Sequence, residues 1–426
     1  MNVLLTTSAA PDFSPFSTKE KRFPLGLGFL ISVLKEAGHN VYFLDNYLNP
    51  TNFYETDYLI ENKIDMVGIY ASTICYRDTL KMFHALEKMR RKGKWKGKIV
   101  VGGPHTSVAP DTIPDFVDYI VQGEGEKAVL DVIDGKTERF ARGERIEDLD
   151  SLPMPAWDYF VKLPYCDSVE WIKDRPIFNM NTSRGCPFSC NFCSVGSIWG
   201  KTYTFMSSRR IYNDIVYLKK KYNIKGIYFR EDNFTLSKKR LTDFCELLLK
   251  NNVNIKWACE TRVDALENNV IKLMHRAGCR ALYIGIESGS ERLLSFIKKN
   301  ISFEDVKRVF KKCREIGIKT AASFMVGIPT ETLEERTQTL ALSEEIKADT
   351  TWINIFVGIP RSELYEYIIE NSLFQYRDKN GLLYLKDHNQ LVDQFYAGKA
   401  SAKIPTLNNK IKYLFYDFGQ RFKGNV

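Results

Sequence analysis

Short apolar runs alternate with longer amphipathic stretches along most of the chain. In its first third, apolar runs such as residues 3–6 and 66–70 have the length of buried strands, whereas residues 25–37 have apolar positions spaced as on one face of a helix. Strands that alternate with helices in this way build a parallel sheet with helices on both faces. We therefore expect an α/β fold that begins with a doubly wound parallel sheet. The expected strands are residues 3–6, 41–45, 66–70, 99–101 and 119–121, and the expected helices are residues 25–37, 78–91 and a stretch from Glu126.

The alternation resumes at residue 177 with longer helices and continues for six strand-helix pairs. Eight such pairs close a barrel, so six predict a barrel that stays partly open. In barrels of this kind the chemistry lies at the carboxyl ends of the strands. The expected strands are residues 177–182, 226–229, 255–259, 281–285, 320–326 and 352–356, and the expected helices are residues 208–222, 238–251, 267–277, 303–316, 332–347 and 362–371.

Prolines mark the boundary between the two alternating regions. Residues 146–176 contain Pro153, Pro155, Pro164 and Pro176, and because proline favours extended backbone paths, this segment is predicted to be a linker. The expected organisation is a Rossmann-like domain at residues 1–145, the linker at 146–176, a partial barrel at 177–375 and a short helical extension at 376–426.

The composition is that of a soluble globular protein. Hydrophobic residues make up 44% and charged residues 27% of the 426 residues, and no apolar run reaches the roughly 18 residues needed to cross a bilayer. The first residues lack the basic region of a signal peptide, so we expect a cytoplasmic protein. Its nine cysteines are an odd number, which fits a reducing compartment and metal binding better than a disulfide framework.

Three of these cysteines, Cys186, Cys190 and Cys193, are spaced C-x3-C-x2-C directly after the first strand of the predicted barrel. Gly185 and Pro187 supply the loop geometry that would let three thiolates converge on one centre. No fourth cysteine or histidine follows at the spacing of a zinc site. A four-iron, four-sulfur cluster with one open iron fits this pattern better than zinc, and three buried core cysteines are the remaining alternative.

The cysteine spacing, with Phe192 before the third cysteine, resembles the signature of the radical S-adenosylmethionine (SAM) enzymes. The resemblance implies that the open iron of a [4Fe–4S] cluster binds SAM, and that an electron from a donor such as flavodoxin or ferredoxin cleaves it to a 5′-deoxyadenosyl radical. Polar residues at the predicted strand ends match positions that this family uses around SAM, most closely Arg262 and Glu287. The alternative for each is a solvated loop charge. The SAM-binding candidates are Phe192, Glu231, Asp232, Arg262, Glu287, Ser288 and Gly327.

Small residues follow three strands of the predicted N-terminal sheet, where a ligand would bind beyond the carboxyl ends. These loops resemble those of the cobalamin-binding domain that precedes the barrel in the B12-binding branch of radical SAM proteins. The Asp-x-His-x-x-Gly motif of some cobalamin proteins is absent, so either cobalamin binds without a histidine from that motif or the domain is vestigial. The candidates are Ser72, Thr73, Gly102, Gly103, Pro104, His105, Thr106, Gly123, Glu124 and Gly125.

With both cofactors, the resemblance implies a methyltransferase that acts on an unactivated carbon. A radical oxidation, cyclisation or rearrangement by the same architecture is an alternative, and a non-catalytic iron-sulfur protein is an alternative of another class. Methylthiolation of tRNA is disfavoured, because that family carries three cysteines in its N-terminal domain and the first 140 residues here contain only Cys75. The sequence identifies no catalytic side chain.

The net charge of +9 is spread along the chain, and only the C-terminal tail is locally basic. The spacing of the apolar residues in this tail predicts one amphipathic helix. It either packs on the barrel or brings the enzyme to an anionic membrane. We expect a small-molecule or lipid substrate and no nucleic acid. The apolar face consists of Ile411, Leu414, Phe415, Phe418 and Phe422.

Overall fold

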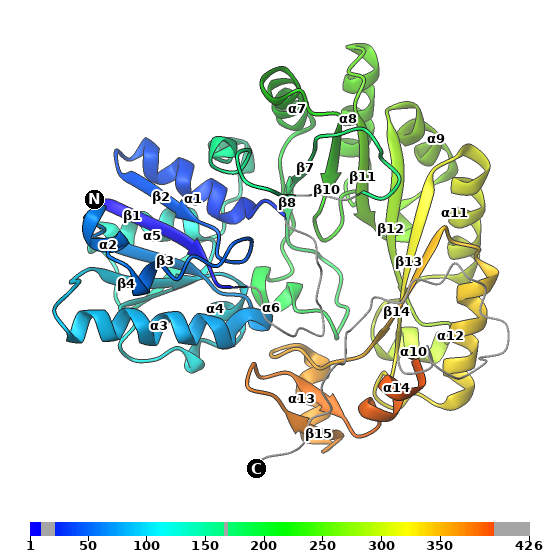
Figure 1. Ribbon diagram of the computed structural model, residues 1–426. Coiled ribbons are helices and arrows are strands. Elements are labelled where there is room, and N and C mark those ends of the chain that lie inside the picture. Colours follow the sequence, from blue (N-terminus) through cyan, green and yellow to red (C-terminus); the bar gives the residue numbers. More distant parts are fainter. Residues whose placement is uncertain (10–21, 166–168, 396–426) are drawn as a thin grey trace.

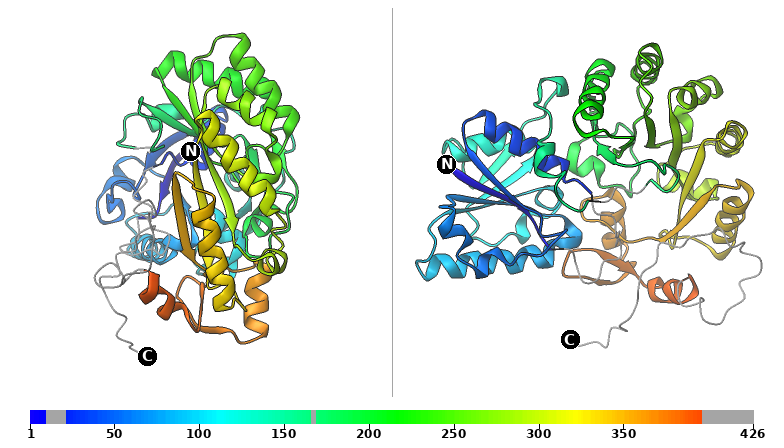
Figure 2. Two further views of the ribbon diagram at one scale, coloured as in Figure 1. Left: turned by 90° about the vertical axis from the view of Figure 1, so that its right-hand side faces the viewer. Right: turned by 45° about the horizontal axis from the view of Figure 1, so that its top comes forward.

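Two parallel β-sheets, each covered by helices, make up the structure, a computed structural model that describes residues 1–9, 22–165 and 169–395 (Figure 1). Each sheet has six strands, and the pairings within each are parallel. Figure 2 shows the N-terminal unit beside the fan of barrel strands, with the barrel helices on the outside. The predicted combination of an α/β sheet domain and a partial barrel is confirmed.

The N-terminal sheet has the strand order β2-β1-β3-β4-β5-β6, as in doubly wound folds. Successive side chains of its central strand pack into different layers, because Val3 and Leu5 share a core with α1 and α5, whereas Leu4 shares one with α3. The strands are β1 (Asn2–Thr7), β2 (Asn40–Leu44), β3 (Met66–Tyr70), β4 (Lys98–Gly102), β5 (Tyr119–Gly123) and β6 (Phe140–Gly143), and the helices are α1 (Leu25–Glu36), α2 (Tyr58–Glu61), α3 (Tyr76–Arg91), α4 (Pro104–Val108) and α5 (Gly125–Ile133).

Strand β6 was not predicted. It pairs only with β5, at the edge of the sheet, and Ala141 is its one buried residue. An edge strand with one buried side chain lacks the apolar run that identifies central strands.

The barrel sheet has the order β14-β13-β12-β11-β10-β7, so β7 and β14 form its two edges and the barrel is open. The helices lie outside this sheet in Figure 1. The strands are β7 (Ile177–Met180), β10 (Gly226–Phe229), β11 (Lys256–Thr261), β12 (Cys279–Glu287), β13 (Lys319–Val326) and β14 (Thr350–Ile355), and the helices are α7 (Ser208–Tyr222), α8 (Lys238–Lys250), α9 (Asn268–Arg276), α10 (Glu291–Phe296), α11 (Phe303–Ile316), α12 (Leu333–Glu345) and α13 (Glu363–Glu370).

Several short elements complete this unit. Strands β8 (Ser183–Arg184) and β9 (Thr204–Phe205) pair around the cysteine loop, which also contains helix α6 (Val195–Trp199). The chain after the barrel forms an antiparallel hairpin, β15 (Phe374–Arg377) and β16 (Leu383–Leu385), before helix α14 (His388–Phe395).

The predicted amphipathic tail helix, with its apolar face from Ile411 to Phe422, lies outside the described residues. Within residues 1–9, 22–165 and 169–395, no helix has the length and apolar character needed to span a membrane.

The segment between the sheets is packed into the protein interior. Its Trp157 and Phe160 are buried and belong to one apolar core that also contains residues of α1, β7 and α7. The Trp157 ring lies 5.4 Å from the Phe23 ring and is stacked on Phe178 of β7, with centroids 5.1 Å apart. The prolines of this segment therefore direct a chain that fills the space between the two sheets.

Candidate functional site

The three motif cysteines follow β7 and lie at the carboxyl end of the barrel sheet. Cys186, Cys190 and Cys193 are partly exposed free thiols. The pKa of Cys193 is raised to about 12, mainly by burial and to a lesser extent by Asp232 and the other two motif cysteines. Burial also raises the pKa of Cys186. Three thiols that converge without a fourth are the donor set for a [4Fe–4S] cluster with one open iron.

In the part of the chain that the structure describes, no three His, Cys, Asp or Glu side chains are grouped as ligands of one ion. A four-iron cluster does not require such a group, because each thiolate binds a different iron. The assignment of the three cysteines to a cluster therefore rests on their spacing in the sequence and on their place in one loop after β7.

The start of the cysteine loop is held by a buried carboxylate and a glycine. Glu231, directly after β10, accepts hydrogen bonds from the Thr182 amide at 3.2 Å and the Thr182 hydroxyl at 2.7 Å, and from the Ser183 hydroxyl. Gly185 has a φ of +82°, and a Cβ there would lie 2.2 Å from the carbonyl oxygen of Thr202. Only glycine fits this turn without moving the backbone.

Arg262, one residue beyond β11, contacts the middle of the cysteine loop. Its guanidinium carbon lies 3.8 Å from the centre of the Phe188 ring, and Nη1 lies 3.5 Å from the Cys190 sulfur. Asp264 accepts from Nε and Nη2 at 3.0 to 3.3 Å, and the Lys299 carbonyl accepts from Nη2 at 2.8 Å. These contacts fix the plane of the guanidinium beside Cys190 in the cysteine loop.

The two acidic candidates after β10 have different environments. Glu231 is enclosed, its pKa is raised by burial, and Arg240 lies 3.9 Å away. Asp232 lines a cavity, accepts a hydrogen bond from the Gly185 amide, and has a pKa raised to about 6, mainly by burial. Glu231 lines the same cavity, but its carboxylate already accepts hydrogen bonds from Thr182 and Ser183 and so supports the cysteine loop. Asp232 is therefore the acid more available to a ligand.

The other SAM candidates are spread along the next strands. Glu287 has a φ of +75° and pairs with the buried Lys299 at 2.9 Å. Ser288 is hydrogen-bonded to Thr339 at 3.2 Å. The Gly327 amide donates to the Glu331 carboxylate at 2.7 Å. Phe192 is partly buried and packs against the main core.

A cavity of about 440 Å³ lies between the two sheets, close to the cysteine loop. On one side it runs along the whole of β3, since both Met66 and Tyr70 line it, and its inner wall includes the buried side chains of Leu5, Val100 and Val121. An apolar slot that opens at the carboxyl ends of a doubly wound sheet fits a large cofactor with a buried tail. On the barrel side it is lined by Asn181, Ser183, Arg184, Arg230, Asp232 and Glu260.

Six of the ten cobalamin candidates line this cavity: Gly102, Gly103, Pro104, Gly123, Glu124 and Gly125. The other four, Ser72, Thr73, His105 and Thr106, are not among its lining residues. Residues of helix α1 line the cavity as well and were not predicted to do so.

His105 is enclosed within the fold. Its Nδ1 lies 3.2 Å from the Thr73 hydroxyl and its Nε2 lies 2.9 Å from the Thr112 hydroxyl, while the ring stacks on Tyr76 at 3.7 Å. Burial lowers its pKa to about 4, so the ring is neutral at pH 7. No described residue that lines the cavity is a histidine.

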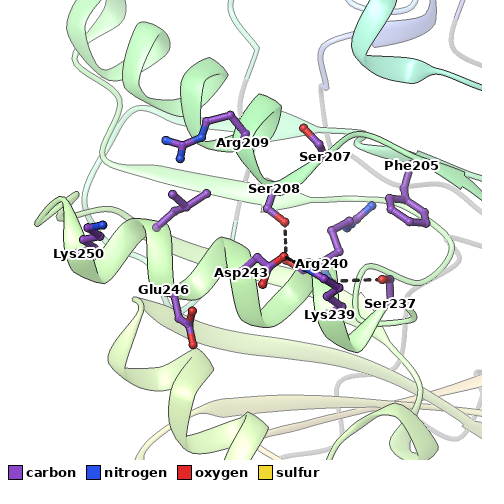
Figure 3. A pocket seen from close by; sticks show the side chains of 11 residues that line it. Phe205, Ser207, Ser208, Arg209, Ser237, Lys239, Arg240, Asp243, Glu246 and Lys250 are labelled. Atoms are coloured by element: carbon purple, nitrogen blue, oxygen red, sulfur yellow. Dashed lines mark hydrogen bonds and ion pairs between the residues drawn. The ribbon is translucent and has the colours of Figure 1, made fainter.

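A second cavity, of about 630 Å³, lies on the outside of the barrel between α7 and α8 (Figure 3). Most of the residues that line it are polar or charged, and none of the SAM or cobalamin candidates is among them. Arg240 at its edge is held inside the protein, where its backbone carbonyl accepts from Ser208 at 2.8 Å and its guanidinium donates to the Thr182 carbonyl at 3.3 Å. The cavity between the sheets is therefore the better candidate site.

A doubly wound sheet facing the cysteine loop of an open six-stranded barrel defines a radical SAM enzyme with a cobalamin-binding domain. Residues 180–342 match the family model of the radical SAM superfamily, and residues 17–133 match that of the B12 binding domain. The chain belongs to the B12-binding branch of the radical SAM superfamily, and the predicted resemblance is confirmed. The cofactors of this branch are a [4Fe–4S] cluster, SAM and cobalamin.

Relatives with different reactions share this architecture. An uncharacterized methyltransferase of Pyrococcus horikoshii is 31% identical over 374 residues, which cover 82% of this chain and 79% of the relative. An anaerobic magnesium-protoporphyrin IX monomethyl ester cyclase of Rubrivivax gelatinosus is 24% identical and covers 80% of this chain and 66% of the cyclase. The solved structure of the radical SAM methyltransferase TsrM from Kitasatospora setae superposes with a TM-score of 0.72 at 15% identity, over 92% of this chain and 87% of TsrM, and so shows a shared fold.

Some residues at the site were not predicted from the sequence. Lys299 is the partner of Glu287, and Arg184 and Trp199 line the cavity beside the cysteine loop. Arg184 lies in the cysteine motif, two residues before Cys186, which was a usable signal. Lys299 gave none, because it is one of two adjacent lysines twelve residues from its partner.

Proposed function

We propose that this radical SAM enzyme transfers a methyl group to an unactivated carbon of a small-molecule substrate. The observation that carries this proposal is the single cavity lined by both sheets, with glycine-rich loops on one wall and Asp232 and Glu260 on the other. A methyl donor bound by one sheet and a radical generated at the other can act on the same carbon only if they share such a space. The relative named as a methyltransferase supports the proposal.

When bound, the cluster with SAM supplies a 5′-deoxyadenosyl radical that removes a substrate hydrogen, and cobalamin supplies the methyl group. Cys186, Cys190 and Cys193 would each bind one iron. Their partial exposure leaves a route for an electron donor such as flavodoxin or ferredoxin.

Three charged side chains would orient SAM. Arg262, held flat by Phe188 and Asp264, would bind the carboxylate, because a fixed guanidinium matches that planar group. Asp232 and Glu287 would accept hydrogen bonds from the amino group or the ribose. Glu231 would act through the loop that it holds, and Phe192, Ser288 and Gly327 would shape the surrounding walls.

The N-terminal loops would hold cobalamin. Gly102, Gly103, Gly123 and Gly125 leave space at the strand ends, and the apolar slot along β3 would take the buried part of the cofactor. The loops would be supported from behind by Ser72, Thr73, His105 and Thr106, with Pro104 and Glu124 at the rim.

A second candidate is an oxidative cyclisation, which the cyclase relative favours. This reaction would use the same radical but would leave no methyl group on the product. The two candidates therefore differ in what happens to the methyl group of SAM.

The test uses anaerobically reconstituted protein, a strong reductant and SAM with a deuterated methyl group, with and without cobalamin. Methyl transfer predicts S-adenosylhomocysteine that forms only with cobalamin, 5′-deoxyadenosine, and a labelled methyl group on the product. Formation of 5′-deoxyadenosine without cobalamin-dependent S-adenosylhomocysteine would contradict methylation and favour cyclisation. The Cys186→Ala variant is the control and should form neither.

A further inference from the structure

Four charged side chains connect the glycine-rich loop of the N-terminal sheet to the start of the cysteine loop. Arg184, two residues before the first motif cysteine, pairs with Glu126 at 2.5 Å through Nη2 and with Glu124 through Nη1. Arg145 pairs with Glu124 at 3.1 Å and donates to the Thr202 carbonyl at 3.2 Å. We call Glu124, Glu126, Arg145 and Arg184 the charge clasp.

The clasp is withdrawn from water. The side chains of Glu124, Glu126 and Arg184 are 3%, 7% and 12% exposed. The Arg145 and Arg184 guanidinium groups lie 5.6 and 5.9 Å from the Trp199 ring. Two carboxylates and two guanidiniums balance in charge, and removing one member would leave a buried charge without its partner, which is costly. The clasp is therefore a fixed arrangement rather than a set of loose surface pairs.

Each end of the clasp is continuous with one cofactor region. Glu124 lies between β5 and α5, Gly125 and Glu126 are the first two residues of α5, and all three line the cavity. At the other end, Arg184 also lines the cavity and is followed by Gly185, whose positive φ sets the direction of the chain into Cys186. A ligand that orders one loop would thereby restrict the other.

We propose that the charge clasp positions the cysteine loop against the cobalamin cavity and couples the two sites, so that each cofactor binds more tightly when the other is present. This proposal rests on the cofactors of the proposed function, but it applies whether the enzyme catalyses methylation or cyclisation. Coupling of this kind is reciprocal, and typical values are about 5- to 150-fold.

The experiment measures hydroxocobalamin affinity by absorbance titration under anaerobic conditions, with cluster-free and cluster-reconstituted full-length protein, and without SAM or substrate. The wild-type protein should bind at least about fivefold more tightly when the cluster is present. In Arg184→Gln the ratio of the cluster-loaded to the cluster-free affinity should fall to near one. Arg209→Gln, which changes an exposed arginine on α7 outside the cavity, is the matched control and should keep the wild-type ratio.

Arg184→Gln could lower the affinity ratio simply by impairing cluster assembly, because Arg184 lies two residues before Cys186. A second variant controls for this. Glu126→Gln weakens the clasp from the N-terminal side, far from the cysteines in the sequence, and should also lower the ratio while its iron content stays at the wild-type value. Arg184→Lys, which keeps the charge but not the forked geometry, should restore part of the ratio.

The outcomes separate the clasp from the proposed function. Equal hydroxocobalamin affinities of cluster-loaded and cluster-free wild-type protein would overturn the proposed coupling alone. The same conclusion would follow if Glu126→Gln kept the affinity ratio of the wild-type protein. Failure of both cluster-free and cluster-loaded wild-type protein to bind hydroxocobalamin would overturn the proposed function together with it.

Discussion

The two sheets prepare their carboxyl ends for ligands in opposite ways. The N-terminal sheet ends in Gly102, Gly103 and Gly123, which leave space, whereas the barrel side of the cavity is lined by charged residues such as Asp232 and Glu260. The first wall can hold a large ligand through shape and apolar contact, and the second can orient a small polar one. The comparison indicates that the two sides of one cavity can bind their ligands by different means. Substitutions on one side should therefore weaken the binding of one ligand without affecting the other.

The largest expected effect comes from the three motif cysteines at the carboxyl end of the barrel sheet. Replacing Cys186, Cys190 or Cys193 with Ala should abolish cluster assembly and all SAM cleavage, because each thiolate binds an iron and no spare donor is nearby. Iron content and the visible chromophore measure the first effect, and 5′-deoxyadenosine measures the second. Hydroxocobalamin should still bind, with the affinity of the cluster-free wild-type protein. A variant with full iron content would refute the ligand assignment.

Removal of the Arg262 side chain, directly after β11, should weaken the binding of SAM only. Arg262→Ala should lower SAM affinity by roughly 10- to 150-fold, corresponding to a charge-assisted hydrogen bond of about 1.5 to 3 kcal/mol. Equilibrium binding of SAM to cluster-loaded protein provides the measurement. Because Arg262 also touches Cys190, iron content must be determined in parallel. Unchanged SAM affinity would show that Arg262 only supports the loop.

On the N-terminal side of the cavity, hydroxocobalamin affinity should depend on the size of the side chain at a glycine position. A Cβ at Gly102 would lie 3.5 Å from the Val121 Cβ, an ordinary contact, so Gly102→Ala should be tolerated. Gly102→Leu should fill part of the slot and lower hydroxocobalamin affinity by about tenfold, in the range of overpacking costs of about 1 to 3 kcal/mol. Absorbance titration measures the change, and SAM binding should be unaffected. Equal affinities of the Ala and Leu variants would place cobalamin elsewhere.

The smallest effect concerns an acid that serves only the fold. Glu335 in the first turn of α12 forms a capping box with Thr332 and pairs with Arg292 at 2.7 Å, and these contacts lower its pKa to about 2 from 4.5. A lowered pKa stabilises the fold above about pH 4.5, and the contribution is lost as the pH falls toward 2.

Glu335→Gln should therefore lower the free energy of unfolding by about 1 kcal/mol at pH 7, and the difference from wild type should shrink below about pH 4.5. Urea unfolding of the cofactor-free protein, followed by circular dichroism at several pH values, tests this. A difference that does not depend on pH would show that the charge of Glu335 is not what stabilises α12.

Most of the fold could be predicted because central strands are buried on both faces and therefore appear as apolar runs, as in Met66–Tyr70. The hairpin of β15 and β16 was missed although Asp378-Lys-Asn-Gly381 between its strands is a turn sequence. Its strands are short and follow a helix, so the signal was weak.

Residues that line the cavity could be predicted where they lie at the end of a strand, as Gly102 and Gly123 do. Whether such a residue faces the cavity depends on the backbone around it. Gly102 at the end of β4 lines the cavity, whereas Thr106, within α4, donates its hydroxyl to the Gly103 and Val121 carbonyls and is not a lining residue. Partners from distant segments, such as Arg184 with Glu126, follow no periodicity and become visible only in three dimensions.

The aromatic packing of Phe23, Trp157 and Phe178 has a consequence for how the chain folds. Each sheet contributes apolar surface to a core that the segment between them completes. A polypeptide divided within that segment would leave this surface in water on both pieces, so neither piece is expected to reach a native state alone. The protein should lose its structure in one cooperative transition, and brief protease treatment should leave no stable half-length fragment.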